Sequence, residues 1–142
     1  MASAWVGGIW MAGYIAAPVL FQTLTDKSLA GMLAGKLFAV TAYMGMVCAV
    51  YLLIYLTAMS GKRVLSQSKF WIVGGMLLII LLGQFGIQPL LAELKAQALP
   101  LYVMESPYAG SFRLWHGAAS IAYLLQSLLG AVLLLKMYSG RT

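Results

Sequence analysis

Four apolar stretches, each long enough to cross a lipid bilayer, take up most of this 142-residue sequence. A helix needs about 20 apolar residues to span a hydrocarbon core about 30 Å thick. The stretches cover residues 3–23, 37–59, 70–91 and 114–138. None of them alternates polar and apolar residues over the ~10-residue segments of a membrane β-barrel. The sequence therefore predicts an all-α membrane protein with a single domain, residues 1–142, built as a four-helix transmembrane bundle that runs up-down-up-down.

Composition argues against a water-soluble domain and against a nucleic-acid-binding protein. Charged residues make up 8% of the chain, against about 25% in soluble domains. The net charge of +6 comes from basic residues in short loops and at helix ends, where they orient membrane proteins and contact anionic lipid. No basic patch is interleaved with aromatic residues. We therefore expect the lipid bilayer as the partner and no nucleic acid.

The first apolar stretch is predicted to be a retained helix, because no Lys or Arg precedes it and it is longer than the apolar core of a signal peptide. Basic residues near helix ends then predict the orientation. The loop between the second and third stretches, together with the C-terminal end, carries five of them: Lys62, Arg63, Lys69, Lys136 and Arg141. The other two loops carry four. This bias predicts that both termini lie in the cytoplasm.

The first and third stretches resemble each other, since both have Gly and then Pro toward their C-terminal ends. Pro18 and Pro89 each remove a backbone donor, which predicts a bend in both helices. Gly8, Ala12 and Ala16 recur every four residues and form a smooth stripe that another helix could approach closely. The second and fourth stretches both open with a basic and then an aromatic residue. The chain is either two copies of one helical hairpin or a chance similarity between apolar helices.

His116, the only histidine, is the first candidate for chemistry. It could ligate haem iron or copper or carry a proton, or it could hydrogen-bond a neighbouring helix as an interfacial residue. One histidine cannot supply both axial ligands of a haem, so that interpretation needs a dimer or a second ligand type. Met44 and Cys48, four residues apart, offer soft sulfur ligands for Cu(I), although methionine is more often adaptable core filler.

Polar groups inside the stretches form a second set of candidates. Gln84 and Gln88 share one helix face, and amides in a bilayer normally face other helices, where a hydrogen bond is worth about 0.6–2 kcal/mol. A packing role and a substrate site both remain open. Tyr14 and Tyr123 carry hydroxyls that need partners. The expected partners of the glutamines lie on the fourth stretch: Gln126, Ser127 and Ser120.

Charged candidates gather toward the same membrane face, which is non-cytoplasmic in the predicted orientation. Lys36 and Arg113 could pair with Asp26 and Glu93, or hold an anionic group such as a lipid phosphate or a porphyrin propionate. No nucleotide-binding, Ser/His/Asp or zinc-protease motif is present. No carboxylate lies deep in the membrane, which argues against a proton-coupled transporter of the usual kind. The sequence leaves enzymatic activity undecided and leans against it.

Several segments carry a family resemblance: GGIWMAGYIAAPVLF, LAGKLF, GQFGIQPLLAELK and FRLWHGAASIAYLLQSLLG. Together they resemble a bacterial family described as domain of unknown function 4149, which is related to the animal transmembrane protein 205 family. More distantly, the group is similar to the copper-resistance inner-membrane protein D and to a membrane protoporphyrinogen oxidase that binds haem b. The resemblance implies a four-helix protein of the bacterial inner membrane without an established activity.

These observations predict that the protein handles a small molecule or a metal at a polar site near one membrane face, between the first, third and fourth helices. One alternative is a haem- or porphyrin-associated membrane redox protein. The sequence leaves the cofactor open, with haem and copper as the candidates. Another is a structural or accessory subunit of a larger membrane complex; a homo-oligomer is also open. The candidate binding residues are His116, Arg113, Gln84, Gln88, Tyr14, Lys36, Gln126 and Ser120, with His116 as the candidate metal ligand.

Overall fold

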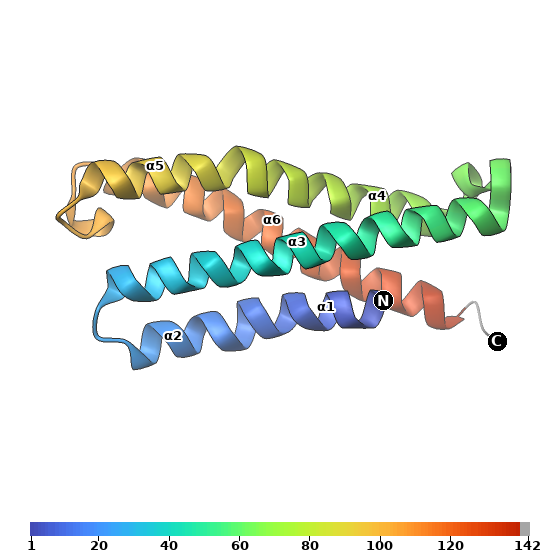
Figure 1. Cartoon of the computed structure of the whole chain (residues 1–142), viewed down its shortest axis with the longest axis horizontal. Coiled ribbons are helices and arrows are strands. Elements are labelled where there is room, and N and C mark those ends of the chain that lie inside the picture. Colours follow the sequence, from blue (N-terminus) through green and yellow to red (C-terminus); the bar gives the residue numbers. More distant parts are fainter. Residues whose placement is uncertain (140–142) are drawn as a thin grey trace.

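The computed structural model describes residues 1–139 and confirms the all-α four-helix bundle (Figure 1). The helices run up-down-up-down, and no strand occurs in the described residues. Arg141, counted above for the orientation, lies outside them. Four helices are long and apolar enough to cross a membrane, and they are numbered here as transmembrane helices 1 to 4: Ala2–Thr23, Lys27–Ser66, Ser68–Ala98 and Ala109–Ser139.

Transmembrane helices 2 and 4 begin earlier than predicted, at Lys27 and Ala109 instead of residues 37 and 114. The prediction followed the apolar stretch, whereas a helix continues until its backbone donors are capped. The Asp26 carboxylate accepts hydrogen bonds from the backbone N–H groups of Ser28 at 2.8 Å and Leu29 at 3.2 Å. This N-cap fixes the start of helix 2 well before its apolar part.

Transmembrane helices 1 and 3 are each interrupted by a six-residue π-helical segment that precedes a proline. Pro18 and Pro89 are the second residues of the α-helical pieces that follow. Each proline lacks an N–H group, so the carbonyl four residues earlier loses its α-helical donor and the turn widens. The pieces are α1 (Ala2–Trp10), η1 (Met11–Ala16) and α2 (Ala17–Thr23), and α4 (Ser68–Leu81), η3 (Leu82–Ile87) and α5 (Gln88–Ala98).

Transmembrane helix 2 consists of α3 (Lys27–Ser60) and the 3₁₀ turn η2 (Gly61–Ser66). Gly61 ends α3 with a φ of 52°, in the left-handed region that glycine adopts without a steric penalty. Transmembrane helix 4 is the single helix α6 (Ala109–Ser139), and the loop before it contains the 3₁₀ turn η4 (Val103–Glu105).

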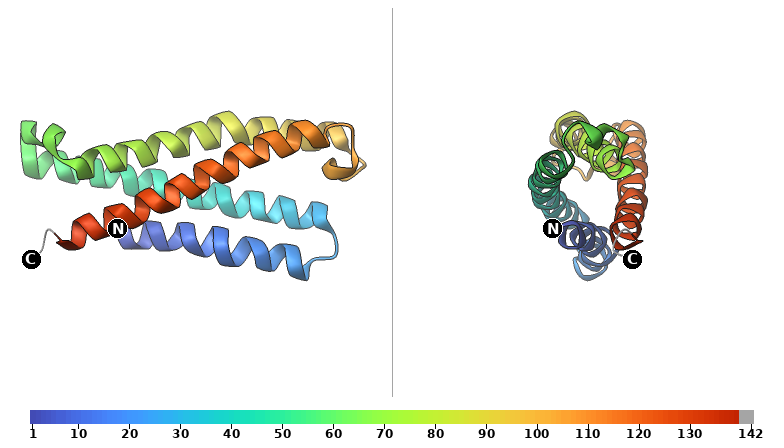
Figure 2. Two further views of the ribbon diagram at one scale, coloured as in Figure 1. Left: turned by 180° about the vertical axis from the view of Figure 1, so that it is seen from behind. Right: turned by 90° about the vertical axis from the view of Figure 1, so that its right-hand side faces the viewer.

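The four helices form a ring when the bundle is viewed along its axis (Figure 2). Helix 1 packs against helices 2 and 4, and helix 3 packs against the same two neighbours. Helices 1 and 3 therefore lie diagonally and share no extended interface. Helices 1, 3 and 4 meet only in the apolar main core, on either side of helix 4.

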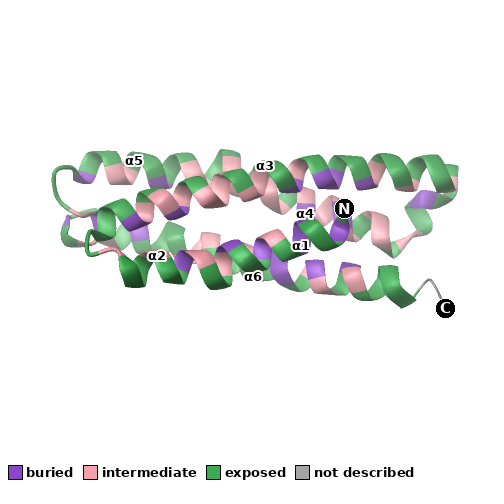
Figure 3. Ribbon diagram, turned by 60° about the horizontal axis from the view of Figure 1, so that its bottom comes forward, coloured by how far each residue is buried: buried purple, intermediate pink, exposed green. Residues whose placement is uncertain are grey.

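The main core lies where α1, α3, α4 and α6 meet. Its inner faces form the buried stripes in Figure 3, and its largest fully buried side chains are Trp5, Val6, Val73, Met76 and Leu133. A second cluster packs under the loop between helices 3 and 4, with Leu91, Ala98, Val103 and Phe112. It fixes the junction of α5 and α6, which positions the candidate site described below.

The outer faces of the bundle are apolar. On α3, Val40, Val47 and Ile54 are 66%, 66% and 63% exposed and recur every seven residues along one face. Such a face cannot be presented to water over its whole length without a covering. Lipid supplies that covering, so the chain is an integral membrane protein.

Transmembrane helix 1 is the shortest of the four, at 22 residues. Its first residues lie well inside the bundle, so α3, α4 and α6 extend past it at the end where α3 joins α4 (Figure 1). The other end holds the loops that join helices 1 to 2 and 3 to 4.

Candidate functional site

A lysine, a phenylalanine and a histidine meet at the end that holds the loop between helices 3 and 4. The Lys95 Nζ of α5 donates a long hydrogen bond of 3.4 Å to the Gly31 carbonyl of α3. The same Nζ lies 5.8 Å from the centre of the Phe112 ring of α6, within the range of a cation–π contact. His116 stacks on Phe112, with ring centres 5.5 Å apart and planes 11° apart. We call Lys95, Phe112 and His116 the Lys95 cluster; it joins transmembrane helices 2, 3 and 4.

The local structure explains the geometry of the Lys95 cluster. Phe112 and His116 are four residues apart on α6, so their rings lie one above the other. Phe112 is buried in the second core cluster, whereas His116 is exposed. Lys95 is half-buried, and it lies close enough to act electrostatically on His116. The sequence identified His116 as a site candidate and placed Lys95 at the same membrane face without making it a site residue, because its contact to Gly31 lies 64 positions away in the chain.

The sequence left two roles open for Lys36 and Arg113, and the first of them, ion pairs with Asp26 and Glu93, is not formed in the structure. No ion pair occurs within residues 1–139, and both acids have other roles. Asp26 caps α3, as described above, and Glu93 accepts a hydrogen bond from the Gln97 amide at 3.1 Å. Lys36 and Arg113 are exposed side chains. This end of the bundle thus carries cations that no carboxylate of the described chain neutralises.

Three glutamines inside the bundle lack side-chain hydrogen bonds among the described residues. Gln126 of α6 is only 4% exposed, and both its amide nitrogen and its amide oxygen are buried without a partner. Gln84 in η3 and Gln88 at the start of α5 are half-buried. A buried polar group without a partner costs about 1–3 kcal/mol. The unpaired amide of Gln126 is therefore the largest uncompensated polar group in the core.

The two serines expected beside these glutamines have other partners. Ser127 Oγ accepts a hydrogen bond of 2.8 Å from the Trp10 indole, which ties helix 4 to helix 1. Ser120 Oγ donates to the His116 carbonyl one turn earlier at 2.9 Å, and its side chain is exposed. The predicted hydrogen bonds from the glutamines to helix 4 are not formed, because α6 directs these hydroxyls elsewhere.

Tyr123 is the centre of an aromatic contact that joins helices 1, 2 and 4. Its hydroxyl donates to the Ile9 carbonyl and lies at the backbone N–H of Gly13. An undistorted α-helix would bond these two backbone groups to each other. The hydroxyl therefore enters helix 1 at the junction of α1, which contains Ile9, and η1, which contains Gly13. Phe38 and Tyr14 pack edge-on against the Tyr123 ring, at 5.1 and 6.5 Å between ring centres. Tyr14 is otherwise exposed.

No group of three or more His, Cys, Asp or Glu side chains comes together within residues 1–139. Cys48 belongs to the apolar core, and the Met44 methyl group fills the space in front of Gly8. His116 has Lys95, a cation, as its charged neighbour. The residues present within the described chain do not fit a haem iron or copper site with several protein ligands.

The ring of apolar helices defines a small integral membrane protein that spans the bilayer four times. Within that class, the chain belongs to the family described as Domain of unknown function (DUF4149), whose model matches residues 1–100. The match covers the first three transmembrane helices and ends before α6, so it includes Lys95 and leaves out Phe112 and His116. No curated protein and no solved structure matches the chain.

Proposed function

We propose that this membrane protein binds a small anionic molecule at the Lys95 cluster, near one membrane face. The observation that carries the proposal is the half-buried Lys95 ammonium, which has no carboxylate partner among the described residues. An ammonium has three donors, and Lys95 uses one of them in a long bond to a carbonyl. A carboxylate or phosphate would supply the missing counter-charge through charge-assisted hydrogen bonds.

The neighbours of Lys95 indicate the rest of the ligand. The exposed His116 ring, which stacks on the buried Phe112, offers a flat surface near the cation. Arg113, the residue after Phe112 in α6, carries a second positive charge at this end of the bundle. These groups fit an acidic head on a flat or apolar body. A positive neighbour opposes a metal cation at His116, so a small molecule is favoured over a metal.

A porphyrin-associated protein is the second candidate, and the same cluster favours it. A porphyrin is flat and carries carboxylates that Lys95 and Arg113 would hold. Axial ligation of its iron by His116 would need a ligand from outside this chain, such as a second copy in a homo-oligomer. This candidate would agree with the proposed distant relationship to the copper-resistance inner-membrane protein D group, and the animal transmembrane protein 205 relationship is proposed alongside it.

We also propose a bacterial inner membrane with both termini in the cytoplasm. In that orientation the Lys95 cluster opens to the non-cytoplasmic side. The remaining alternative is a structural subunit of a larger membrane complex. Such a subunit would contact its partners through the outer faces of the helices, and Lys95 would bind no ligand.

The experiment compares binding of protoporphyrin, which has two carboxylates, with binding of its dimethyl ester to the purified protein in detergent. We expect the ester to bind about 10-fold more weakly, since a charge-assisted hydrogen bond is worth about 1.5–3 kcal/mol. Lys95→Gln should weaken binding of the acid by a similar factor and leave the ester unchanged. Lys62→Gln, which removes a charge at the opposite end of the bundle, is the control.

Two outcomes would contradict the proposal: a wild-type protein that does not bind the acid more tightly than the ester, and a folded Lys95→Gln protein that binds the acid like wild type. The absorption spectrum and metal content of the purified protein separate the candidates. A Soret band supports the porphyrin, whereas stoichiometric copper would overturn the preference for a small molecule.

A further inference from the structure

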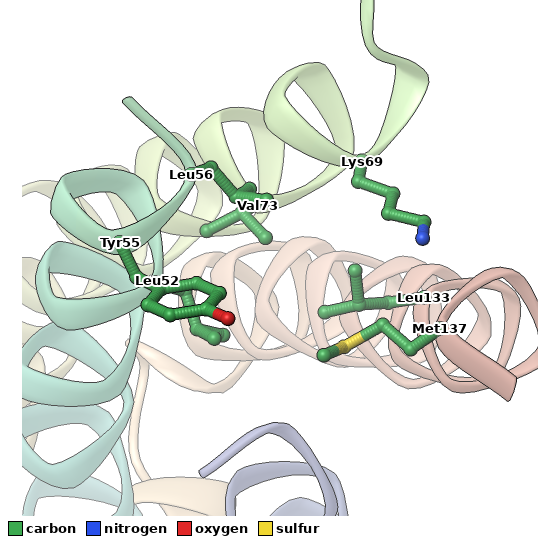
Figure 4. A pocket seen from close by; sticks show the side chains of 7 residues that line it. All are labelled: Leu52, Tyr55, Leu56, Lys69, Val73, Leu133 and Met137. Carbon is green, nitrogen blue, oxygen red and sulfur yellow. The ribbon is translucent and has the colours of Figure 1, made fainter. Parts of the chain in front are cut away.

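At the end of the bundle opposite the Lys95 cluster, α3, α4 and α6 extend past the start of α1 (Figure 1). A groove opens between these three helices (Figure 4). It encloses about 120 Å³. Its lining comes from all three helices: Leu52, Tyr55 and Leu56 of α3, Lys69 and Val73 of α4, and Leu133 and Met137 of α6.

The groove has an apolar floor and a polar rim. Val73 and Leu133 are fully buried members of the main core and form the floor. Tyr55 and Lys69 stand on different sides of the groove, with the Tyr55 hydroxyl directed inward (Figure 4). Neither the hydroxyl nor the Lys69 ammonium has a hydrogen-bond or ion-pair partner within residues 1–139. Each is therefore available to a ligand.

The surroundings and the size of the groove indicate which kind of ligand fits it. The outer faces of these helices are covered by lipid, and an apolar groove left empty there forfeits dispersion contacts along its walls. Pockets for cofactors and drug-sized ligands hold about 300–1,000 Å³. This groove is smaller, and it fits a stretch of one acyl chain.

The charge at this end of the bundle indicates which lipid head group would bind beside the groove. Basic side chains gather near the groove: Lys62, Arg63, Lys69 and Lys136. The acidic residues of the chain lie toward the opposite end, in or near the other two loops: Asp26, Glu93 and Glu105. The rim thus complements a negative head group, since a Lys or Arg near the membrane surface attracts anionic lipid.

We propose that the groove is a binding site for an anionic phospholipid. One acyl chain lies against Val73, Leu133 and Met137, the Lys69 ammonium pairs with the phosphate, and the Tyr55 hydroxyl donates a hydrogen bond to the same head group. This site is separate from the Lys95 cluster and does not depend on the function proposed there.

Native mass spectrometry of the protein in detergent tests the site. The protein is titrated with dioleoyl phosphatidylglycerol, which is anionic, or dioleoyl phosphatidylcholine, which has the same chains and no net charge. The wild-type protein should retain phosphatidylglycerol at lower concentrations. Lys69→Gln should weaken this binding about five-fold, which corresponds to about 1 kcal/mol, and leave phosphatidylcholine unchanged. Lys62→Gln removes a charge at the same end outside the groove and should have a smaller effect.

A second variant tests the chain-binding part. Met137→Trp fills the groove from its exposed rim, so it should reduce binding of both lipids while the melting temperature shows that the protein is folded. Inorganic phosphate should not displace the lipid, because it lacks an acyl chain. The proposal is overturned if the wild-type protein does not prefer the anionic lipid, if Lys62→Gln weakens binding as much as Lys69→Gln, or if folded Met137→Trp binds both lipids like wild type.

Discussion

At the scale of single residues, Gly13 has no room for a side chain, because Tyr123 already occupies the space. A Cβ atom at Gly13 would lie 2.9 Å from the Tyr123 Cζ and 3.0 Å from its hydroxyl oxygen, and closer still to a ring carbon. The ring has little freedom to withdraw, since Phe38 and Tyr14 pack against it and its hydroxyl bonds to the Ile9 carbonyl.

Gly13→Ala should therefore destabilise the protein by about 1–3 kcal/mol, the usual cost of overpacking, and lower its melting temperature in detergent. Gly7→Ala is the matched control, because nothing lies within 4 Å of a Cβ atom at Gly7. Equal melting temperatures for wild type and Gly13→Ala would show that Tyr123 does not hold this position in the membrane.

The sequence indicated which side chains need an explanation, but it did not predict which residues they contact in the structure. The sequence identified His116, Gln126 and Tyr123 as side chains that need an explanation. It did not identify Lys95 as a site residue, because the contact to Gly31 is made only when helices 2 and 3 pack side by side. It assigned the serines of α6 to the glutamines, whereas the turn of the helix directs Ser127 to Trp10.

At the scale of elements, the small-residue stripe of helix 1 packs as the sequence indicated at Gly8, where the Met44 methyl group of α3 fills the space in front of the glycine. Ala12, the next member of the stripe, is buried. Gly7, the neighbour of Gly8, is exposed and has open space in front of it. Of these two adjacent glycines, Gly8 therefore faces α3 and Gly7 faces the outside of the bundle.

Gly8→Leu should separate helices 1 and 2 and cost about 1–3 kcal/mol, measured as a lower melting temperature in detergent. Gly7→Leu makes the same chemical change on the open face and should leave the melting temperature close to that of wild type. A destabilisation by Gly7→Leu as large as that by Gly8→Leu would mean that the stripe does not define the contact with α3.

The existence of the helices was predictable, but their boundaries and their inner distortions were not. Hydropathy marks the part of a helix that matches the bilayer, so it missed the polar first turns of α3 that the Asp26 cap stabilises. The two prolines predicted bends, and the structure shows π-helical segments before both. At η1 the entry of the Tyr123 hydroxyl from α6 adds to the effect of Pro18, and no local pattern encodes that contact.

At the scale of the whole molecule, the sequence gives the number of helices and their alternating direction, and it leaves the order around the ring open. Short loops place consecutive helices side by side. The remaining pair, helices 1 and 4, is joined by the core around Trp5 and Leu133 and by the bond from Trp10 to Ser127. These contacts close the ring and keep helices 1 and 3 apart.

The orientation of the bundle is open to a direct measurement. A reporter that is active only in the cytoplasm should be active when fused after Thr142, because the basic bias places the C-terminus there. A reporter active only outside the cytoplasm should be active when inserted at the exposed Leu101, in the loop between helices 3 and 4. The reverse pattern of activities would place the Lys95 cluster at the cytoplasmic face.

The unequal lengths of the four helices make the bundle sensitive to hydrophobic mismatch. Helix 1, with 22 residues, spans about 33 Å at the rise of an α-helix, close to the hydrocarbon thickness of a bilayer. The α-helical part of helix 2, α3, is continuous over 34 residues, so it must tilt or project beyond the hydrocarbon. A thicker bilayer would draw the long helices upright while the short one stays in place. Bilayer thickness would then change the angle at which helix 1 crosses its two neighbours.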